Sequence, residues 1–384
     1  MPDFLTEGRT KLEVPELSKF RTPSGDYAPS LTSVFYNPHM EFSRDISISV
    51  AQVLARENPK LRICDPLAGV GARGLRYAKE VKGVSKVVVN DRSPEAVEFI
   101  RRNVEHNDLT EIVEIHEGDA SVLLQSYRPG FHLVDVDPFG SPAPFVGPAC
   151  SALDRRGALF ATATDVAPLC GVYPKACVRR YGAKPVKTEY AHEIGIRILI
   201  GFCQRQGAVL GVALLPIMAH STRHYFRVYF RAKRSVSAIN EVLSQHGYIS
   251  HCRYCTSRFL TFGLAGELPV ICQCGGKFEH AGPLWLGRLM DKDFLSKVRE
   301  DLAERGFRLS HFELELLGRC IEEADGPPTF YDVHWLAKLA KAQPKKISKI
   351  ISGLRERGYF ASRTHFSPIG IRTDAPLAEI LNSF

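Results

Sequence analysis

The chain has 384 residues, enough for two or three domains, and its 45% hydrophobic and 24% charged content is that of an ordinary globular protein. No apolar stretch is long enough to span a membrane, and the N-terminus lacks a basic-then-apolar signal pattern, so a cytoplasmic protein is expected. The net charge of +8 is concentrated in residues 218–234 and 331–384, which indicates a polyanionic partner.

Short apolar segments alternate with helical ones through the first half of the chain. Strands are predicted at 61–64, 86–90, 112–116, 131–136 and 157–162, with helices between them. This alternation predicts an α/β fold with a parallel sheet covered by helices on both faces. In such sheets, ligands bind beyond the carboxyl ends of the strands.

Acids and glycines follow these strands at the expected binding edge. They are Asp65, Gly69, Gly71, Asp91, Asp119 and Asp137. Any one acid could be a helix N-cap. Acids after four successive strands indicate a ligand site instead.

Two cofactors compete for this pattern. A dinucleotide also needs a glycine turn and an acid about 20 residues further on, which Asp91 satisfies. However, Asp65 leading into the turn disfavours a bound pyrophosphate. S-adenosylmethionine carries no phosphate: Asp65 suits its cationic amino acid end, Asp91 its ribose hydroxyls and Asp119 its adenine amino group. The pattern therefore favours S-adenosylmethionine.

The segment Asp137-Pro-Phe-Gly-Ser141 ends the fourth strand. Pro138 biases Asp137 toward extended geometry. The conjugated amine of a nucleobase is a poor nucleophile, and a carboxylate with a backbone carbonyl can hold its N–H groups and take up a proton during methyl transfer. Phe139 can stack on an extruded base. The segment resembles the Asp/Asn/Ser-Pro-Pro-Tyr/Phe motif of amino-group methyltransferases.

Further segments extend this resemblance, in order, from about Val34 to Thr373. They are Phe35-Tyr-Asn-Pro38, Phe42-Ser-Arg-Asp45, Asp137-Pro-Phe-Gly-Ser141, Thr162-Ala-Thr-Asp165, Tyr190-Ala-His-Glu193 and Thr364-His-Phe-Ser-Pro-Ile-Gly370. Together they resemble the tRNA guanine-N2 dimethyltransferases, which modify guanine 26 of tRNA. The resemblance implies a Rossmann-type S-adenosylmethionine-dependent methyltransferase domain, a C-terminal domain, and N2-methyl- and then N2,N2-dimethylguanine as products.

The resemblance also implies roles for individual residues. Asp137 would be the catalytic carboxylate, followed by Pro138, and Phe35 and Phe139 would clamp the base. The cofactor would be held by Arg44, Asp65, Asp91, Asp119 and Ala120, beside the glycines Gly69 and Gly71.

Residues 223–233 alternate basic or tyrosine residues with mainly apolar ones. On a strand, this puts one set of side chains on one face: Arg223, Tyr225, Arg227, Tyr229, Arg231 and Lys233. In a methyltransferase fold this would be the last strand. A structural role and contacts with phosphates or bases both remain open.

Four of the ten cysteines cluster, and the scattered remainder suits a reducing compartment. The cluster is Cys252, Cys255, Cys272 and Cys274. It nearly fits a four-thiolate zinc ribbon, although the second pair is C-x-C where C-x-x-C is commoner. We predict a structural zinc ion; the alternative is four reduced, buried thiols.

Helices are predicted at 312–324, 331–341 and 344–357, with strands at 359–363 and 370–372, and this order resembles a winged helix whose third helix is basic. We expect a methyltransferase domain over 1–234 and an α+β tRNA-binding domain over 235–384, with a zinc-ribbon-like element at 250–276 and a winged-helix-like part at 291–384. No self-complementary apolar face is evident, so a monomer is expected. A non-catalytic RNA-binding adaptor and a DNA amino-methyltransferase are the alternatives.

Overall fold

The computed structural model describes residues 2–19, 31–127 and 130–384, and the chain divides into two compact units. The first unit comprises Met1–Pro138, Pro144–Ala161 and Ser296–Leu314, and the second comprises Phe139–Ala143, Thr162–Leu295 and Glu315–Phe384. Each unit therefore contains segments that are distant in the sequence. The expected domains, 1–234 and 235–384, stay a prediction.

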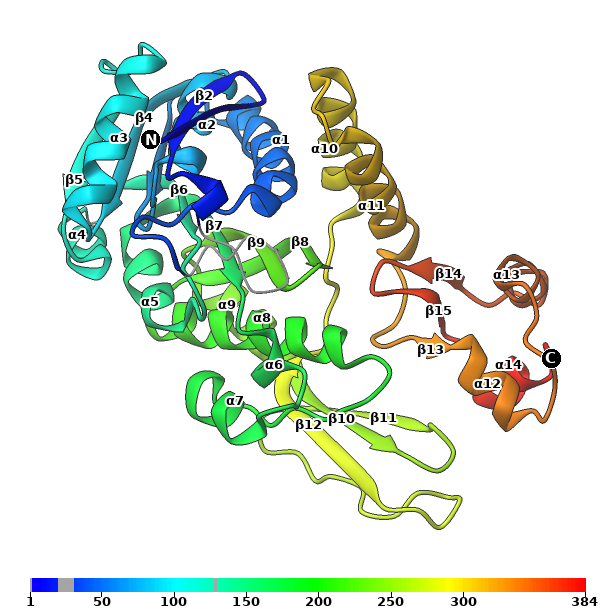
Figure 1. The fold of residues 1–384 in the computed structure, drawn as a ribbon. Coiled ribbons are helices and arrows are strands. Elements are labelled where there is room, and N and C mark those ends of the chain that lie inside the picture. Colours follow the sequence, from blue (N-terminus) through cyan, green and yellow to red (C-terminus); the bar gives the residue numbers. More distant parts are fainter. Residues whose placement is uncertain (1, 20–30, 128–129) are drawn as a thin grey trace. The chain divides into compact units, whose positions relative to one another are not determined.

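The first unit contains a parallel sheet in the order β5-β4-β3-β6-β7, as the alternating pattern predicted (Figure 1). Its strands are β3 (Leu61–Asp65), β4 (Val84–Asp91), β5 (Val113–Glu117), β6 (Phe131–Val136) and β7 (Leu153–Ala163). The inner strands β3, β4 and β6 contain apolar segments because both faces of a parallel sheet are covered, whereas the edge strand β5 alternates polar and apolar residues. Val87, Val88 and Val89 of β4 are accordingly all buried.

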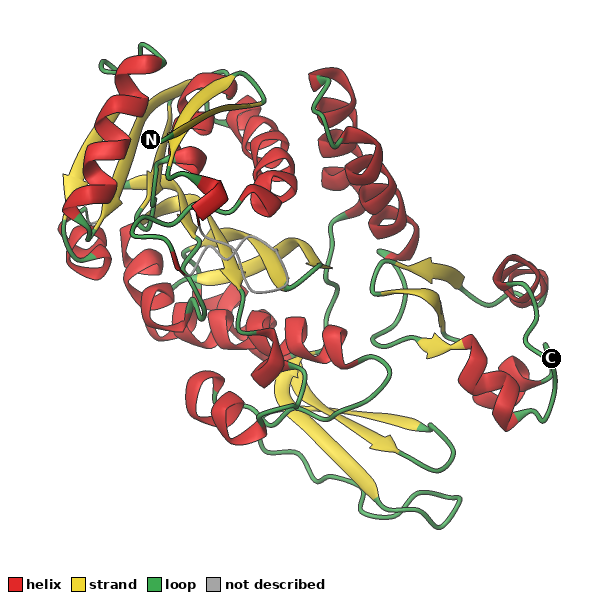
Figure 2. Ribbon diagram, viewed as in Figure 1, coloured by secondary structure: helices red, strands yellow, loops and turns green. Residues whose placement is uncertain are grey.

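Among the described residues, one helix precedes these strands and four connect them (Figure 2). They are α1 (Glu41–Glu57), α2 (Ala72–Glu80), α3 (Pro94–His106), α4 (Ala120–Ser126) and α5 (Ala143–Ala152), preceded by the hairpin β1 (Asp3–Glu7) and β2 (Thr10–Val14) and the 3-10 turns η1 (Leu17–Lys19) and η3 (Pro38–Met40). The start of α3 follows from its sequence. Ser93 accepts a hydrogen bond from the Ala96 N–H, and Pro94 occupies the first turn, where no intrahelical donor is needed.

The second unit begins with helices and an antiparallel pair of strands. These are α6 (Val166–Leu169), α7 (Pro174–Tyr181), α8 (Ala191–Val209), β8 (Ala213–Thr222), β9 (Tyr225–Lys233) and α9 (Val236–Ser244). The basic and tyrosine face expected on β9 is largely buried. Arg227 donates to the Thr162 hydroxyl at 2.8 Å and lies over the ring of Tyr229. A phosphate contact from Arg227 or Tyr229 is therefore excluded, because both faces of this strand are covered.

Two small sheets follow in the chain. The first has the order β11-β10-β12, with β10 (His246–Cys252), β11 (Arg258–Phe262) and β12 (Phe278–Trp285). The second has the order β13-β15-β14, with β13 (Tyr331–Asp332), β14 (Ala361–Thr364) and β15 (Ser367–Thr373). The strands expected at 359–363 and 370–372 correspond to β14 and β15, which pair antiparallel. The remaining helices are α10 (Lys292–Arg305), α11 (Ser310–Glu323), α12 (Val333–Leu339), α13 (Ile347–Glu356) and α14 (Leu377–Leu381).

The last of these sheets and the helices beside it share a small core of their own. Leu336 of α12, Ile350 and Leu354 of α13, and Ile371 of β15 are buried together. Among the described parts of the chain, no helix has the length and apolar character needed to cross a membrane.

Candidate active site

A pocket in the first unit lies at the carboxyl ends of β3 and β6. It brings together Phe35, Arg44, Asp65 and Asp137, all four of which the sequence predicted. The full lining is Phe35, Tyr36, Asn37, Arg44, Asp65, Leu67, Ala68, Val70, Ala72, Arg73 and Asp137. The pocket therefore combines a glycine-containing turn with strand-end carboxylates.

The turn between β3 and α2 depends on two glycines. Gly69 has φ +55° and Gly71 has φ +83°, in the left-handed region that favours glycine. A Cβ atom on Gly69 would lie 2.3 Å from the carbonyl oxygen of Phe35. Asp91 fixes this turn, because one of its carboxylate oxygens accepts the Gly69 N–H at 2.8 Å and the other accepts the Ser93 N–H at 2.9 Å.

Asp65 is buried at the end of β3, where it accepts the Gly74 N–H at 2.9 Å. Its burial, and then the neighbouring charge of Asp135, raise the pKa of Asp65 to about 7. A cation bound beside this carboxyl group would favour its ionised form. The position thus suits a positively charged ligand group.

Arg73 lies among the carboxylates of the pocket. Its Nε donates to Oδ2 of Asp137 at 3.1 Å, and its Nη2 contacts the same oxygen. Its Nη1 lies 3.4 Å from Oδ2 of Asp135, which also accepts a hydrogen bond from the Tyr77 hydroxyl at 2.6 Å. Arg73 was not among the residues predicted from the sequence. A signal was nevertheless present in the sequence: Arg73 falls in the first turn of a helix, where a cation is unfavourable unless acids face it.

Arg44 is fixed by a residue that the sequence analysis also missed. Its Nε donates to Glu7 at 2.6 Å, and its Nη2 donates to the Asn37 carbonyl at 3.1 Å. The Tyr36 hydroxyl donates to Glu7 at 2.6 Å. No motif surrounds Glu7, and its contact with Arg44 spans 37 positions, so the sequence held no signal for it.

Asp119 caps α4, accepting the N–H groups of Ser121 at 2.9 Å and Val122 at 3.1 Å. It is exposed, whereas Ala120 behind it is buried. Neither residue lines the pocket, and neither do Gly69, Gly71 and Asp91. Helix capping accounts for one oxygen of Asp119, and its role toward a cofactor stays a prediction.

Both rings of the predicted base clamp are exposed. Phe139 is 72% exposed and Phe35 is 39% exposed, whereas Pro138 is buried. The turn that carries Phe139 is tied to the segment 162–165. The Gly140 N–H donates to the Thr164 hydroxyl at 2.7 Å, and the Thr164 N–H donates to the Gly140 carbonyl at 2.9 Å. These bonds fix the turn while its phenyl ring stays accessible.

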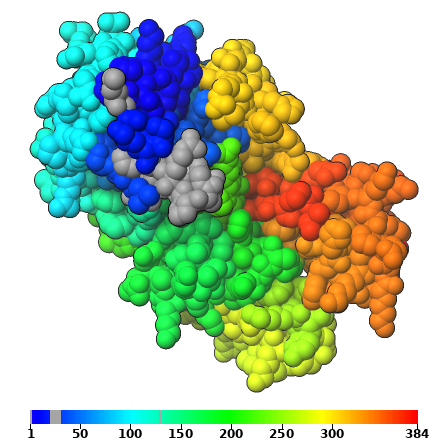
Figure 3. Space-filling view, in the orientation of Figure 1, coloured from blue at the N-terminus to red at the C-terminus, as the bar shows by residue number. Residues whose placement is uncertain are grey.

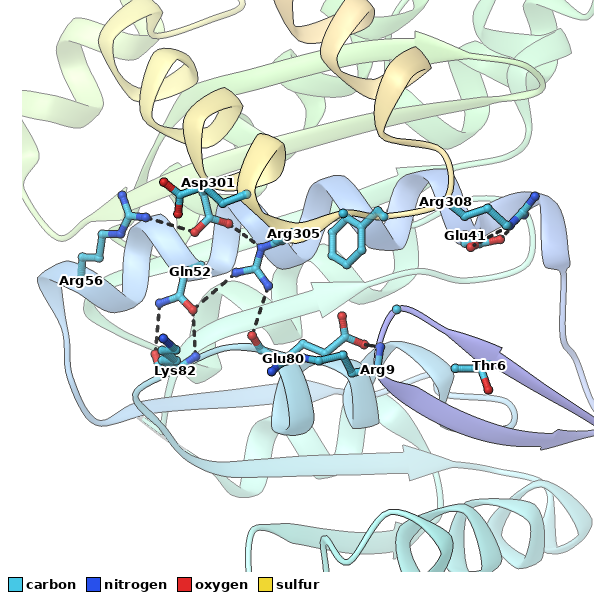
Figure 4. A pocket seen from close by; sticks show the side chains of 14 residues that line it. Thr6, Arg9, Glu41, Gln52, Arg56, Glu80, Lys82, Asp301, Arg305 and Arg308 are labelled. Atoms are coloured by element: carbon cyan, nitrogen blue, oxygen red, sulfur yellow. Dashed lines mark hydrogen bonds and ion pairs between the residues drawn. The ribbon is translucent and has the colours of Figure 1, made fainter.

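A larger cavity of about 730 Å³ also lies in the first unit (Figure 4). Its walls include the β1–β2 turn and the end of α10, and Figure 3 shows both of these segments at the surface. Its buried acids are already ion-paired: Asp301 with Arg56 at 3.1 Å, and Glu41 with Arg308. We assign the chemistry to the smaller pocket, because it lies at the carboxyl ends of the parallel strands and contains the strand-end acids.

The four clustered cysteines of the second unit converge. Their sulfur atoms all lie within 4.8 Å of one another, with Cys252 and Cys274 3.5 Å apart and Cys255 and Cys272 also 3.5 Å apart. A tetrahedral zinc ion with Zn–S bonds of about 2.3 Å separates its sulfurs by about 3.8 Å. The donor set and its spacing therefore fit this metal.

Comparisons with known proteins agree with this geometry. The model of the family described as N2,N2-dimethylguanosine tRNA methyltransferase matches residues 8–384. A tRNA (guanine(26)-N(2))-dimethyltransferase of Methanosphaera stadtmanae is 44% identical over 379 residues, covering 98% of this chain and 95% of that protein. The structure of Trm1 from Pyrococcus horikoshii with S-adenosyl-L-methionine is 35% identical, with a TM-score of 0.87 and 99% of each chain covered.

Proposed function

The chain belongs to the N2,N2-dimethylguanosine tRNA methyltransferase family, and we propose that it transfers two methyl groups in succession from S-adenosylmethionine to N2 of guanine 26 in tRNA. The observation that carries this proposal is Asp137, a half-buried carboxylate at the rim of a pocket formed by a glycine turn. The names of the relatives and the cofactor of the Pyrococcus horikoshii structure support the substrate and the methyl donor.

The residues of the pocket fit the cofactor. Asp65 would face its ammonium group, Asp91 its ribose and Asp119 with Ala120 its adenine, while Arg44 lines the amino acid end. Gly69 allows the backbone of the turn to approach the backbone of Phe35 closely, since a Cβ on Gly69 would collide with the Phe35 carbonyl oxygen. Three carboxylates face one guanidinium, that of Arg73. Arg44 is paired with Glu7, so once a bound cation ionises Asp65 the three carboxylates outweigh Arg73 and favour a ligand whose sulfonium and ammonium outweigh its single carboxylate.

When bound, S-adenosylmethionine supplies an electrophilic methyl carbon, which the N2 lone pair attacks as the carbon–sulfur bond breaks and its electrons stay on sulfur. Asp137 accepts a hydrogen bond from the amine and receives the proton that the nitrogen loses. Phe35 and Phe139 stack on the guanine after it leaves its helix. Pro138 holds Asp137 extended at the strand end. Once Asp137 returns its proton to water, a second transfer can follow.

Two further features support a tRNA partner. Lys345, Lys346 and Lys349 are exposed at the start of α13, where a winged-helix-like part would present them to phosphates. We also propose that Cys252, Cys255, Cys272 and Cys274 hold a structural zinc ion. That ion would fix the loops that follow β10 and precede β12, without a part in the chemistry.

The test measures methyl transfer from labelled donor to a tRNA transcript, with mass analysis of the nucleosides. Expected are N2-methylguanosine early and N2,N2-dimethylguanosine later, and neither product from a transcript with adenine at position 26. Asp137→Ala should reduce transfer by at least about 100-fold while the protein still binds the donor. A folded protein that binds tRNA without methylating it would support an adaptor. Methylation of duplex DNA alone would support a DNA methyltransferase.

A further inference from the structure

We infer that Arg73 is a positioning residue for methyl transfer: it holds one oxygen of Asp137 so that the other is presented to the guanine amine. This inference rests on the proposed function and adds a residue to it. Arg73 contacts Oδ2 of Asp137 through both Nε and Nη2. Two donors of a rigid planar group on one oxygen fix the position of that oxygen relative to the guanidinium.

Arg73 is itself held from several sides. Its Nη1 donates to the Ser47 hydroxyl at 3.2 Å, and its Nη2 lies 3.5 Å from the Ser43 hydroxyl. Both serines are buried in α1, and Ser47 donates to the Ser43 carbonyl at 2.7 Å. Asp135 restrains Nη1 from the other side at 3.4 Å. The guanidinium therefore cannot swing with the carboxylate it holds.

Arg73 is buried, so it is not an ordinary surface charge exposed to solvent. Its side chain is 5% exposed, against 18% for Asp137 and none for Asp135. A buried charge of this kind persists only when it is paired and hydrogen-bonded. Of the two carboxylates paired with Arg73, Asp135 is buried in the core and Asp137 is the one that reaches the pocket.

Orientation matters more for this reaction than for an ordinary ion pair. The N2 lone pair is delocalised into the purine, so the amine must be held in one direction as it turns toward the methyl carbon. Misplacing a reacting group by about 1 Å can cost about 100-fold in rate. The second transfer should be more sensitive, because N2-methylguanine retains a single N–H with which Asp137 can locate the nitrogen.

The experiment compares Arg73→Lys with the unmodified protein in donor affinity, kcat, KM for tRNA and the ratio of dimethylated to monomethylated product. Lysine keeps the charge but lacks the planar fork. We expect kcat to fall about 10- to 100-fold, the product ratio to fall, and the Kd for S-adenosylmethionine to change less than about threefold. In an Asp137→Asn background, Arg73→Lys should cause little further loss, since Arg73 acts through the carboxylate that this background lacks.

Arg197→Lys is the matched control. Arg197 is an equally buried arginine, paired with Glu193 at 2.9 Å, and its hydrogen-bond partners among the described residues lie in the second unit. It should lower the melting temperature without changing the product ratio. If Arg73→Lys does not fold, Ser47→Ala decides, because it removes one bond to Arg73 and should lower kcat about fivefold with donor affinity retained.

The outcomes separate this inference from the proposed function. An unmodified protein that does not methylate tRNA would overturn the proposed function. With that protein active, unchanged kcat and product ratio in the Arg73 variant would overturn the inference. A loss of kcat matched by an equal loss of donor affinity would also overturn it, because Arg73 would then serve binding rather than positioning.

Discussion

Asp91, at the end of β4, accepts a hydrogen bond from the Gly69 N–H of the preceding strand's turn at 2.8 Å. A residue proposed to bind ribose therefore also closes the loop that approaches the cofactor. Its second oxygen accepts the Ser93 N–H at 2.9 Å. The two tasks share one carboxylate, so substitutions at Asp91 affect the shape of the turn together with its charge.

Asp91→Ala should weaken the binding of S-adenosylmethionine about 10- to 100-fold, since hydrogen bonds to a charged group contribute about 1.5–3 kcal/mol. Asp91→Asn should lie between Ala and the unmodified protein, because an amide oxygen can still accept one N–H. Calorimetric titration with the donor measures this. Ser93→Ala is the control: it removes the cap of α3 but leaves the Gly69 bond. Unchanged affinity in Asp91→Ala would exclude Asp91 from the site.

Gly69→Ala should abolish donor binding for a steric reason. At φ +55°, the new Cβ would lie 2.3 Å from the carbonyl oxygen of Phe35, and backbone cannot give way as a flexible side chain can. Gly211→Ala separates collision from backbone strain, because Gly211 has φ +74° and nothing within 4 Å of an added Cβ. Both variants should lose about 1 kcal/mol of stability or more, but only Gly69→Ala should lose the donor in titration calorimetry.

The parallel sheet and part of the pocket were predictable from the sequence, and the reason is geometric. Residues that end parallel strands meet at one edge, so Asp65 and Asp137 share a pocket although 72 positions separate them. Arg44 and Phe35 came from a family resemblance rather than from any local pattern. Their positions in the pocket could not be derived from periodicity.

The residues that were missed, or whose burial was left open, depend on tertiary contacts. Glu7 pairs with Arg44, and Arg73 with Asp137, across separations that no local pattern encodes. For Arg227, a structural role and a phosphate contact were both left open, because alternation along a strand separates two faces but does not say which is covered. In the structure its guanidinium is buried against Thr162 and Tyr229.

Metal removal tests the cysteine cluster. The purified protein should contain one zinc ion per chain by elemental analysis, and Cys255→Ser should lose it and lower the melting temperature. Cys203→Ala is the control, since Cys203 is buried in α8 outside the cluster. Donor affinity should survive zinc loss, because the cofactor pocket lies in the other unit. If the purified protein contains no zinc and is equally stable, the four cysteines are reduced thiols and do not form a metal site.

Substituting the exposed lysines of the α13 start tests the tRNA contact. Lys346→Ala with Lys349→Ala should weaken tRNA binding and make the logarithmic dependence of affinity on salt less steep, by about 0.7–0.9 per lost phosphate contact. Filter binding over a series of salt concentrations measures the slope. Lys60→Ala with Lys297→Ala removes the same charge from exposed positions elsewhere. If the salt dependence became less steep by the same amount in both double variants, the effect would come from net charge, and α13 would not be a specific tRNA contact.

Glu313 gives the protein a defined pH dependence of stability. Burial, and then the charge of Asp45, raise the pKa of Glu313 from 4.5 to about 10. Between these values the folded chain holds a proton that the unfolded chain has released, so the free energy of unfolding should fall as pH rises, by at most about 1.4 kcal/mol per pH unit. Glu313→Gln removes the titration and should flatten the curve between pH 6 and 9. Glu315→Gln, half-exposed two residues further along α11, should leave the slope unchanged. Denaturant unfolding across this range measures both, and equal slopes in Glu313→Gln and the unmodified protein would mean that the carboxyl group is ionised in the folded state.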